Sequence, residues 1–457
     1  MVLSDDRVLD QNKKSPFCRI GTIRGQEVPE GIMSDYKIET KCVQSGYQPK
    51  NGEPRTLPIF QSTTYKYDST NEVGDLFDLK KEGHMYSRIS NPTVAEVEKK
   101  IADLEGGTGA LLTSSGMSAI MTAVLNITSA GQNIIAMTSI YGGTVNLFSV
   151  TLKRLGIEVR FATDSMTAAE LESLFDENTR LFFGESVSNP GLDVFDIEKY
   201  AALAHAHGIP LIVDNTFPTP INFRPFEWGA DIIVHSTTKY MDGHAVVVGG
   251  CIVDGGKFDW TNGKYPELTE PDESYHGVAY VSHFGNEKAY IIKAQCQLIR
   301  DFGVPMTPMS AFILNLGLES MHLRVERHCS NALAVAKYLS AHEKVESVSY
   351  PGLESDPRHA LAMKYMPKGT CGVISFSIKG GREAAVRFMD SLKLAAIVVH
   401  VADARTSVLN PAGTTHRQLS DEQLEAAGIS AGLVRLSVGI ENVEDIIEDI
   451  DQALKNA

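Results

Sequence analysis

Short apolar segments alternate with longer amphipathic segments through the middle of the chain, and this alternation constrains the fold more than any other feature. The apolar segments have the length of β-strands, whereas the segments between them repeat apolar residues at helical spacing. Strands that alternate with helices form parallel βαβ units, with helices covering both faces of the sheet. We therefore predict an α/β domain with a mostly parallel central sheet. The expected strands are 110–113, 134–137, 158–162, 181–185, 211–214 and 231–235, and the expected helices are 116–126, 144–155, 168–175 and 197–207.

The helix that precedes this region is predicted over residues 91–104 by signals at both of its ends. Asn91 can cap the N-terminus, Pro92 suits the first helical position, and Gly106 is a typical stop. Residues 1–36 show neither a strand nor a helix period. We expect them to form an arm on the surface that can wrap a partner subunit.

The C-terminal part of the chain predicts a smaller α+β domain. Residues 267–285, rich in Glu, Pro, Gly and Tyr, are expected to form a long loop or insertion near a domain junction. Helices are expected at 310–318 and 325–339, and strands at 373–378 and 434–437. The predicted division is an N-terminal arm and dimer-contact segment at 1–85, a large α/β domain at 86–295 and the α+β domain at 296–457.

Composition excludes several classes of function. The 42 Lys and Arg against 57 Asp and Glu give a net charge of −15, which repels nucleic acids and anionic membranes at long range. No uncharged apolar run reaches the ~18 residues that a membrane span needs. The six cysteines are scattered without a CxxC pair, which is typical of reduced thiols and predicts no metal site. We expect a cytoplasmic protein without nucleic-acid or membrane partners.

A lysine follows the expected strand 231–235 closely. Ser236 to Tyr240 would lie at the carboxyl end of that strand, where open α/β sheets bind ligands. Lysine is the side chain that forms imines with aldehydes. Taken alone, Lys239 is more typical of an ordinary surface lysine, so its interpretation depends on the residues that the fold brings beside it.

Two other strand ends supply groups that an aldehyde cofactor needs. Asp214 ends the strand 211–214, where a carboxylate can hold a protonated pyridine nitrogen, although it could also merely cap the next segment. The turn Ser115-Gly116-Met117 precedes a helix, so its backbone N–H groups form an anion site at the helix N-terminus, or else only an ordinary cap. Ser236 and Thr238 could add hydroxyl groups to the same phosphate. Together with Lys239, these strand ends predict a pyridoxal 5'-phosphate site.

Seven motifs occur in a characteristic order along the chain. They are YSRISNPT at 86–93, SGM at 115–117, YGGT at 141–144, ESVSNP at 185–190, VDNT at 213–216, STTK at 236–239 and RLSVG at 435–439. With these motifs the chain closely resembles the pyridoxal-phosphate enzymes of cysteine and methionine metabolism, which include γ-synthases, γ- and β-lyases and O-acetylhomoserine sulfhydrylases. The resemblance runs from about residue 38 to the C-terminus and implies an aspartate-aminotransferase-like fold (fold type I).

The resemblance implies roles for residues that composition and spacing alone would leave unassigned. Tyr86 and Arg88 would reach across a dimer interface to the phosphate of the neighbouring subunit, so a homodimer would be the catalytic unit and a homotetramer the expected assembly. Tyr141 would stack on the pyridine ring and act as an acid or base near the leaving group. Asn189 and Arg435 would bind the substrate α-carboxylate, Arg435 through its bidentate fork.

Within this family the chain looks most like the O-acetylhomoserine sulfhydrylases. Residues 141–148, 272–280, 323–328, 402–404 and 414–417 resemble that branch, and Gly143 stands where methionine γ-lyases resemble one another in having a cysteine. The implied reaction is γ-replacement on O-acetyl-L-homoserine by sulfide or a thiol. The alternative is γ-elimination, as in a methionine γ-lyase or a cystathionine γ-lyase-like enzyme. A catalytically idle member that only binds the cofactor is disfavoured by the intact Lys239.

Three positions depart from the pattern of the sulfhydrylases. His400 stands near the substrate carboxylate where these enzymes usually carry Asn, Asn410 replaces a His before Pro411, and Asp242 replaces a Gly. His400 could bind the carboxylate, favour elimination or be an ordinary buried ring. The choice between γ-replacement and γ-elimination therefore depends on the surroundings of His400.

Overall fold

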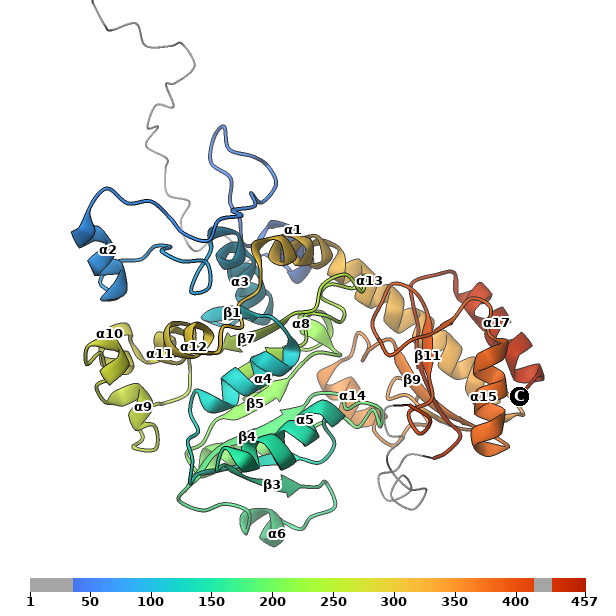
Figure 1. Cartoon of the computed structure of the whole chain (residues 1–457). Helices are drawn as coiled ribbons and strands as arrows, with labels where there is room; N and C mark the ends of the chain where they lie inside the picture. Colours follow the sequence, from blue (N-terminus) through green and yellow to red (C-terminus); the bar gives the residue numbers. More distant parts are fainter. Residues whose placement is uncertain (1–35, 415–429) are drawn as a thin grey trace, which may run out of the picture.

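The computed structural model describes residues 36–414 and 430–457 (Figure 1). It contains a seven-stranded sheet in the first part of the chain and a five-stranded sheet near the C-terminus. The predicted N-terminal arm lies almost entirely outside the described residues, and so do residues 415–417 of the branch motif.

The seven-stranded sheet confirms the predicted α/β architecture. Its strand order is β1-β7-β6-β5-β4-β2-β3, and the neighbours from β6 to β3 pair in parallel. The predicted strands correspond to β1 (Gly109–Thr113), β2 (Asn133–Met137), β3 (Glu158–Ala162), β4 (Thr179–Glu185), β5 (Leu211–Asp214) and β6 (Ile232–His235). The strands β2, β5 and β6 are buried along their whole length, because helices cover both faces of the sheet.

One strand of this sheet was not expected. β7 (Gly250–Asp254) lies between β1 and β6 and is antiparallel to both. It follows β6 without an intervening helix, so the alternation of strands and helices did not indicate it. The connection from β6 to β7 contains Lys239, which places this lysine at the carboxyl end of β6 as predicted.

The helices of the large sheet begin and end near the predicted residues. In α3 (Pro92–Glu105), Asn91 accepts a hydrogen bond from the Thr93 amide and Gly106 adopts the left-handed conformation. The expected helix 144–155 consists of α5 (Gly142–Asn146) and a following π-helical segment, Leu147–Leu152. The remaining predicted helices are α4 (Gly116–Leu125), α6 (Ala168–Glu172) and α7 (Ile197–Ala206).

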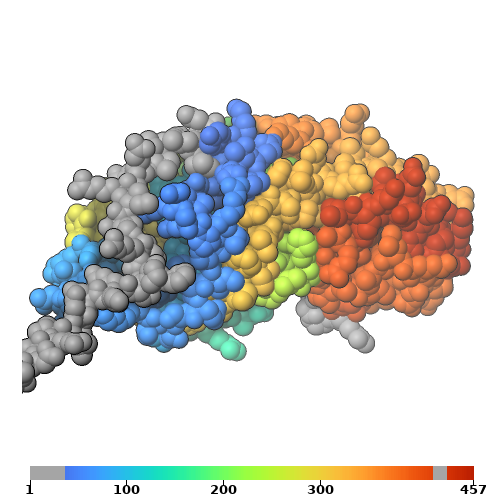
Figure 2. Space-filling model, turned by 90° about the horizontal axis from the view of Figure 1, so that it is seen from above, coloured from blue at the N-terminus to red at the C-terminus, as the bar shows by residue number. Residues whose placement is uncertain are grey.

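The two helices expected at 310–318 and 325–339 are one helix, α13 (Pro308–Ala341). No proline separates the two apolar stretches, and the polar residues between them lie on the same continuous helix. Its residues from Ala311 to Cys329 belong to the core of the large sheet, whereas those from Ala332 onward belong to a second core. α1 (Ile38–Gln44) packs on α13 in Figure 2 and buries Cys42. No helix within the described ranges is long and apolar enough to cross a membrane.

The second core surrounds the five-stranded sheet. Its order is β10-β11-β12-β9-β8, and all neighbours except β10 and β11 are antiparallel. Helix α15 (Gly381–Ser391) packs on this sheet, and α17 (Val443–Lys455) packs on α15 and α13 at the C-terminal end of the molecule (Figure 1). The predicted α+β character of this part is confirmed, while the predicted boundaries at residues 85 and 295 remain predictions. The strands are β8 (Val345–Ser349), β9 (Val373–Ile378), β10 (Ala396–Ile397), β11 (Ser407–Leu409) and β12 (Leu433–Ser437).

The expected long loop at 267–285 is more regular than predicted. It contains α9 (Pro266–Thr269), a 3₁₀ turn at Glu273–Tyr275 and α10 (Tyr280–Phe284). Asp272 caps the 3₁₀ turn at Ser274 and accepts a hydrogen bond from the Tyr280 hydroxyl at 2.8 Å. Tyr275 and Tyr280 of this segment are buried, so it has a local core that its Pro and Gly content did not indicate.

We expect Gly317→Ala to destabilise the protein, although alanine favours a helix by about 1 kcal/mol over glycine. A Cβ at Gly317 would lie 2.5 Å from the Met241 carbonyl oxygen, which belongs to the backbone just after Lys239. Overpacking of this kind costs about 1–3 kcal/mol. The control is Gly74→Ala in α2 (Thr70–Phe77), where a Cβ meets nothing within 4 Å. Thermal unfolding should show a lower Tm for the first variant and an equal or higher Tm for the second. Equal effects would contradict the close approach.

Candidate active site

The site lies at the carboxyl ends of β4, β5 and β6, where three strand ends meet. Asp214 pairs in register with Glu185 of β4 on one side and with Val234 of β6 on the other. Lys239 follows β6, and the N-terminus of α4 follows β1. The sheet therefore brings the predicted lysine, carboxylate and helix N-terminus to one edge.

Asp214 is buried and has one carboxylate oxygen available for a ligand. Its Oδ1 accepts hydrogen bonds from the Thr216 amide at 3.0 Å and the Thr216 hydroxyl at 2.5 Å. Oδ2 accepts none from the described residues. Burial raises the pKa of Asp214, and Thr216 and the nearby His235 offset part of this rise. A cationic N–H donor at Oδ2 would favour the charged carboxylate.

A buried polar network lies behind this carboxylate. His235 Nε2 is 2.6 Å from Glu105 Oε1, which also accepts a hydrogen bond from the Asn215 amide group at 3.1 Å. The Ser186 hydroxyl donates to Asn215 Oδ1 at 2.9 Å. Because these residues come from α3, β6 and the ends of β4 and β5, they hold the strand ends in register. Nothing local in the sequence distinguishes such a buried Glu–His pair from exposed charges.

The N-terminus of α4 has two amide groups that are available for the predicted anion. Ser115 and Ser118 make a reciprocal capping box, which satisfies the Ser118 amide and leaves the amides of Gly116 and Met117 without acceptors among the described residues. A Cβ at Gly116 would lie 2.7 Å from the Cβ of Ser236, so only glycine allows the two segments to approach this closely. Two N–H donors at a helix N-terminus suit a phosphate.

The predicted hydroxyl groups around this anion site differ in availability. Ser115 Oγ serves the cap, and Thr238 Oγ1 both donates to the Gly249 carbonyl at 3.1 Å and accepts from the Gly249 amide at 3.0 Å. Ser236 lies beside Gly116. Ser236 is therefore the best placed of the three to contact a phosphate, and Thr238 mainly fixes the start of β7.

Lys239 is a largely buried amine near a second cation. Its Nζ lies 3.4 Å from His400 Nδ1, and no described carboxylate forms an ion pair with it. Burial, together with the charge of Arg435, lowers the pKa of Lys239 to about 8. The neutral amine, which is the nucleophilic form, is therefore accessible near neutral pH.

Arg435 and Asn189, the two residues predicted to bind the substrate α-carboxylate, contact each other. Arg435 Nη1 donates to Asn189 Oδ1 at 3.2 Å, while its buried Nε has no hydrogen-bond partner. Burial lowers the pKa of Arg435 to about 10. A buried guanidinium without a carboxylate partner is costly, and a bound carboxylate would satisfy its free donors.

Tyr141 stands at the start of α5 with its ring half-exposed, and a buried glutamate holds its backbone. The Tyr141 amide donates to Glu185 Oε2 at 2.6 Å. Burial and the charge of Asp214 raise the pKa of Glu185 well above its usual value. The sequence placed Glu185 in a motif but did not indicate this contact. A Cβ at Gly143 would lie 2.5 Å from the Tyr141 ring, so a larger residue there would displace the ring.

The three residues that depart from the sulfhydrylase pattern have different surroundings. Burial and the charge of Lys239 lower the pKa of His400, so its ring is neutral at neutral pH, and its buried Nε2 has no partner. Asp242 Oδ2 accepts from the Val246 amide at 2.9 Å and shapes the loop after Lys239. The Asn410 amide donates to the Leu433 carbonyl at 2.8 Å and is structural. Only His400 contacts a predicted catalytic group.

Tyr86 and Arg88 are not brought to this site within the described chain. Arg88 donates to the Arg300 carbonyl, and its guanidinium lies 5.2 Å from the centre of the Tyr86 ring. Their predicted contact with the phosphate of a neighbouring subunit stays a prediction.

Comparisons with known proteins agree with this geometry. A family model described as Cys/Met metabolism PLP-dependent enzyme matches residues 39–455. An O-acetyl-L-homoserine sulfhydrylase of Thermus thermophilus is 45% identical over 423 residues, which cover 92% of this chain and 100% of the relative. An O-acetyl-L-homoserine sulfhydrylase of Leptospira meyeri is 43% identical over 93% of this chain and 98% of its own length.

Two further relatives extend the comparison. A homocysteine synthase of Schizosaccharomyces pombe is 45% identical over 92% of this chain and 98% of its own length. A crystal structure from Campylobacter jejuni, of a protein assigned as an O-acetylhomoserine (thiol)-lyase, matches with a TM-score of 0.87 and 36% identity. It covers 92% of this chain and 100% of that chain, and it contains a pyridoxyl-lysine phosphate.

The described residues fit pyridoxal phosphate at independent points. The free amides of Gly116 and Met117 suit its phosphate, and Oδ2 of Asp214 suits its ring nitrogen. The amine of Lys239, which forms no ion pair with a described carboxylate, suits its aldehyde. The predicted fold and cofactor are thereby confirmed, and the chain belongs to the Cys/Met metabolism PLP-dependent enzyme family.

Proposed function

We propose that the protein catalyses γ-replacement on O-acetyl-L-homoserine with sulfide or a thiol, giving homocysteine or methionine and acetate. The observation that carries the proposal is the position of Lys239. Its amine has a pKa of about 8, lies within the influence of the charge of Arg435, and is 3.4 Å from His400 Nδ1. The names of the relatives, which are 43–45% identical, support the choice of substrate.

Pyridoxal phosphate supplies an aldehyde for the substrate amino group and a protonated ring that withdraws electrons from Cα. Arg435 and Asn189 bind the α-carboxylate and orient the Cα proton toward Lys239, which removes it as a general base. Asp214 would hold a protonated ring nitrogen through Oδ2, since Thr216 occupies only Oδ1. Tyr141 would stack on the cofactor ring and exchange a proton near the leaving group.

The alternative to this proposal is γ-elimination by a methionine γ-lyase-like enzyme, and His400 could serve either reaction. The neutral ring contacts Lys239 and can exchange a proton with it, which would assist the proton transfers at Cα and Cβ that elimination also needs. Gly143 favours γ-replacement, because it stands where methionine γ-lyases resemble one another in having a cysteine. A side chain at this position would displace the Tyr141 ring.

We also propose a homodimer as the catalytic unit, assembled into a homotetramer in the cytoplasm, with small amino acids and sulfide or thiols as the only substrates. Exposed apolar side chains near the site support a subunit contact: Val246, Val248 and Leu323 are all more than 60% exposed. Nucleic acids are not expected as partners because of the net charge of −15.

The purified enzyme should form homocysteine from O-acetyl-L-homoserine only when sulfide is added, and Lys239→Ala should lose this activity by at least about 10³-fold because the general base is removed. Homocysteine and 2-oxobutyrate are measured in the same reactions. Rapid formation of 2-oxobutyrate and methanethiol from methionine would contradict the proposal and favour the lyase alternative.

The rate at which the apoprotein takes up pyridoxal phosphate should rise with pH around pH 8. Lys239 has a lowered pKa, so its reactive neutral form predominates above about pH 8 instead of above about 10.5. Arg435→Gln removes a charge that lowers this pKa and should move the midpoint upward. Uptake is followed by cofactor absorbance after fast mixing, with Nα-acetyllysine as the unperturbed reference. A midpoint shared with the reference would contradict the burial of Lys239.

Glu185→Gln should keep most of the activity, whereas Glu185→Ala should lower kcat about five- to tenfold. Burial and the charge of Asp214 raise the pKa of Glu185 and so favour its neutral form, and glutamine preserves the acceptor for the Tyr141 amide. Alanine removes an acceptor worth about 1 kcal/mol at a half-exposed position. Steady-state kinetics compare the two variants with the wild type. An equal loss in both would show that a charged carboxylate is required.

A further inference from the structure

A row of three residues crosses the small-domain sheet and contacts a loop of the large domain. Arg435 of β12 pairs directly with Ser375 of β9, which pairs with Ser349 of β8. The loop is 189–193, which follows β4 and begins with the predicted substrate-binding residue Asn189. Neighbouring strands of the sheet therefore lie beside successive residues of the loop.

Each member of the row holds a successive residue of this loop. Arg435 donates to the side chain of Asn189 at 3.2 Å. The Ser375 hydroxyl donates to the Pro190 carbonyl at 2.7 Å, and the Ser349 hydroxyl donates to the Gly191 carbonyl at 3.0 Å. A shift of the loop by one residue would break all of these contacts together, so the row fixes where Asn189 lies relative to Arg435.

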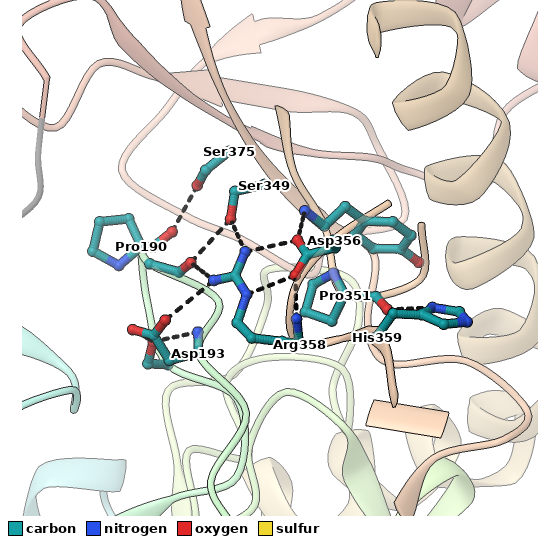
Figure 3. Close-up of polar contacts among 11 residues, drawn as sticks. Pro190, Asp193, Ser349, Pro351, Asp356, Arg358, His359 and Ser375 are labelled. Carbon is teal, nitrogen blue, oxygen red and sulfur yellow. Dashed lines mark hydrogen bonds and ion pairs between the residues drawn. The ribbon is translucent and has the colours of Figure 1, made fainter. Parts of the chain in front are cut away.

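Arg358 fixes the outer end of the row (Figure 3). Its Nη1 donates to the Gly191 carbonyl at 2.6 Å and to Asp193 Oδ1 at 3.1 Å. Its Nη2 donates to the Ser349 hydroxyl at 2.7 Å. One guanidinium therefore binds both the loop and the strand residue that contacts it.

Asp356 holds this guanidinium in place. The two side chains form a bidentate pair, with Nε to Oδ1 at 2.8 Å and Nη2 to Oδ2 at 2.7 Å. Asp356 is buried and also accepts hydrogen bonds from the amides of Arg358 at 2.9 Å and Tyr350 at 3.0 Å. A bidentate pair whose carboxylate is itself held by two backbone amides restricts the Arg358 side chain far more than an exposed ion pair would.

We propose that Arg358, held by Asp356, is a positioning residue for the substrate carboxylate. It fixes the loop 189–193 on the row, so that Asn189 and Arg435 meet the α-carboxylate in one geometry. The buried Nε of Arg435, which has no partner within the described chain, marks where that carboxylate binds. This inference rests on the proposed function for the roles of Asn189 and Arg435.

The test uses the cofactor-loaded full-length enzyme and the variant Arg358→Met. L-2-aminobutyrate, an amino acid without a γ leaving group, is titrated while the absorbance of the bound cofactor is recorded. Its Kd should rise about tenfold, as should the KM for O-acetyl-L-homoserine, because the donors to the carboxylate are misplaced. The kcat should change less than about twofold, and the KM for sulfide should not change.

Arg387→Met is the matched control. Arg387 is an exposed arginine of the small domain on α15, whose nearest carboxylate, Glu383, lies 4.0 Å away. Its substitution should leave the Kd for L-2-aminobutyrate unchanged. A tenfold rise in this control as well would overturn the assignment of the effect to the loop 189–193.

A double-mutant cycle with Asn189→Ala decides whether Arg358 acts through the loop. If it does, the double variant binds L-2-aminobutyrate no more weakly than Asn189→Ala alone. Fully additive losses, or a fall in kcat at constant Kd, would overturn the proposal. Ser349→Ala leaves the Asp356–Arg358 pair intact and repeats the test at lower structural cost, with an expected two- to fourfold rise in Kd. A wild-type enzyme that binds L-2-aminobutyrate but forms no homocysteine would refute the proposed function and leave this test valid.

Discussion

The active site depends on the burial of ionisable groups of the same kind beside one another. Glu185 and Asp214 are neighbours in the sheet, and burial raises the pKa of each. Lys239 lies close enough to Arg435 for the charge of the guanidinium to lower its pKa. Neither cation forms an ion pair with a described carboxylate. A bound carboxylate and a protonated ring nitrogen would place groups of opposite charge beside these pairs, which would favour the charged forms of Arg435 and Asp214.

Local signals in the sequence predicted much of the fold and part of the site. The cap at Asn91, the strand ending in Asp214 and the turn before Gly116 are each encoded within a few residues. The strand β7 and the continuity of α13 were missed, because both depend on what the segment packs against. An apolar run that returns directly beside β6 has no helix before it to mark it as part of the sheet.

The contacts that position the site residues could not be predicted in the same way. Glu185 holds the Tyr141 amide from 44 residues away, and Arg358 reaches Gly191 across 167 residues. Such pairs are set by tertiary structure, and a single sequence carries no periodic trace of them. The roles assigned to Asn189 and Arg435 came from resemblance, and the structure adds the physical reason that the two side chains meet. The predicted contact of Tyr86 and Arg88 with a neighbouring subunit involves a second chain, so it stays a prediction.

The helix α13 belongs to both hydrophobic cores, and this has a consequence for how the molecule unfolds. Its 34 residues extend over roughly 50 Å, with one part packed in the large core and the rest in the small one. A helix that loses the packing of one half also loses the cooperative hydrogen bonding that supports the other half. We therefore expect the two cores to unfold together along α13, with the amide protons at the centre of this helix protected by the packing of both.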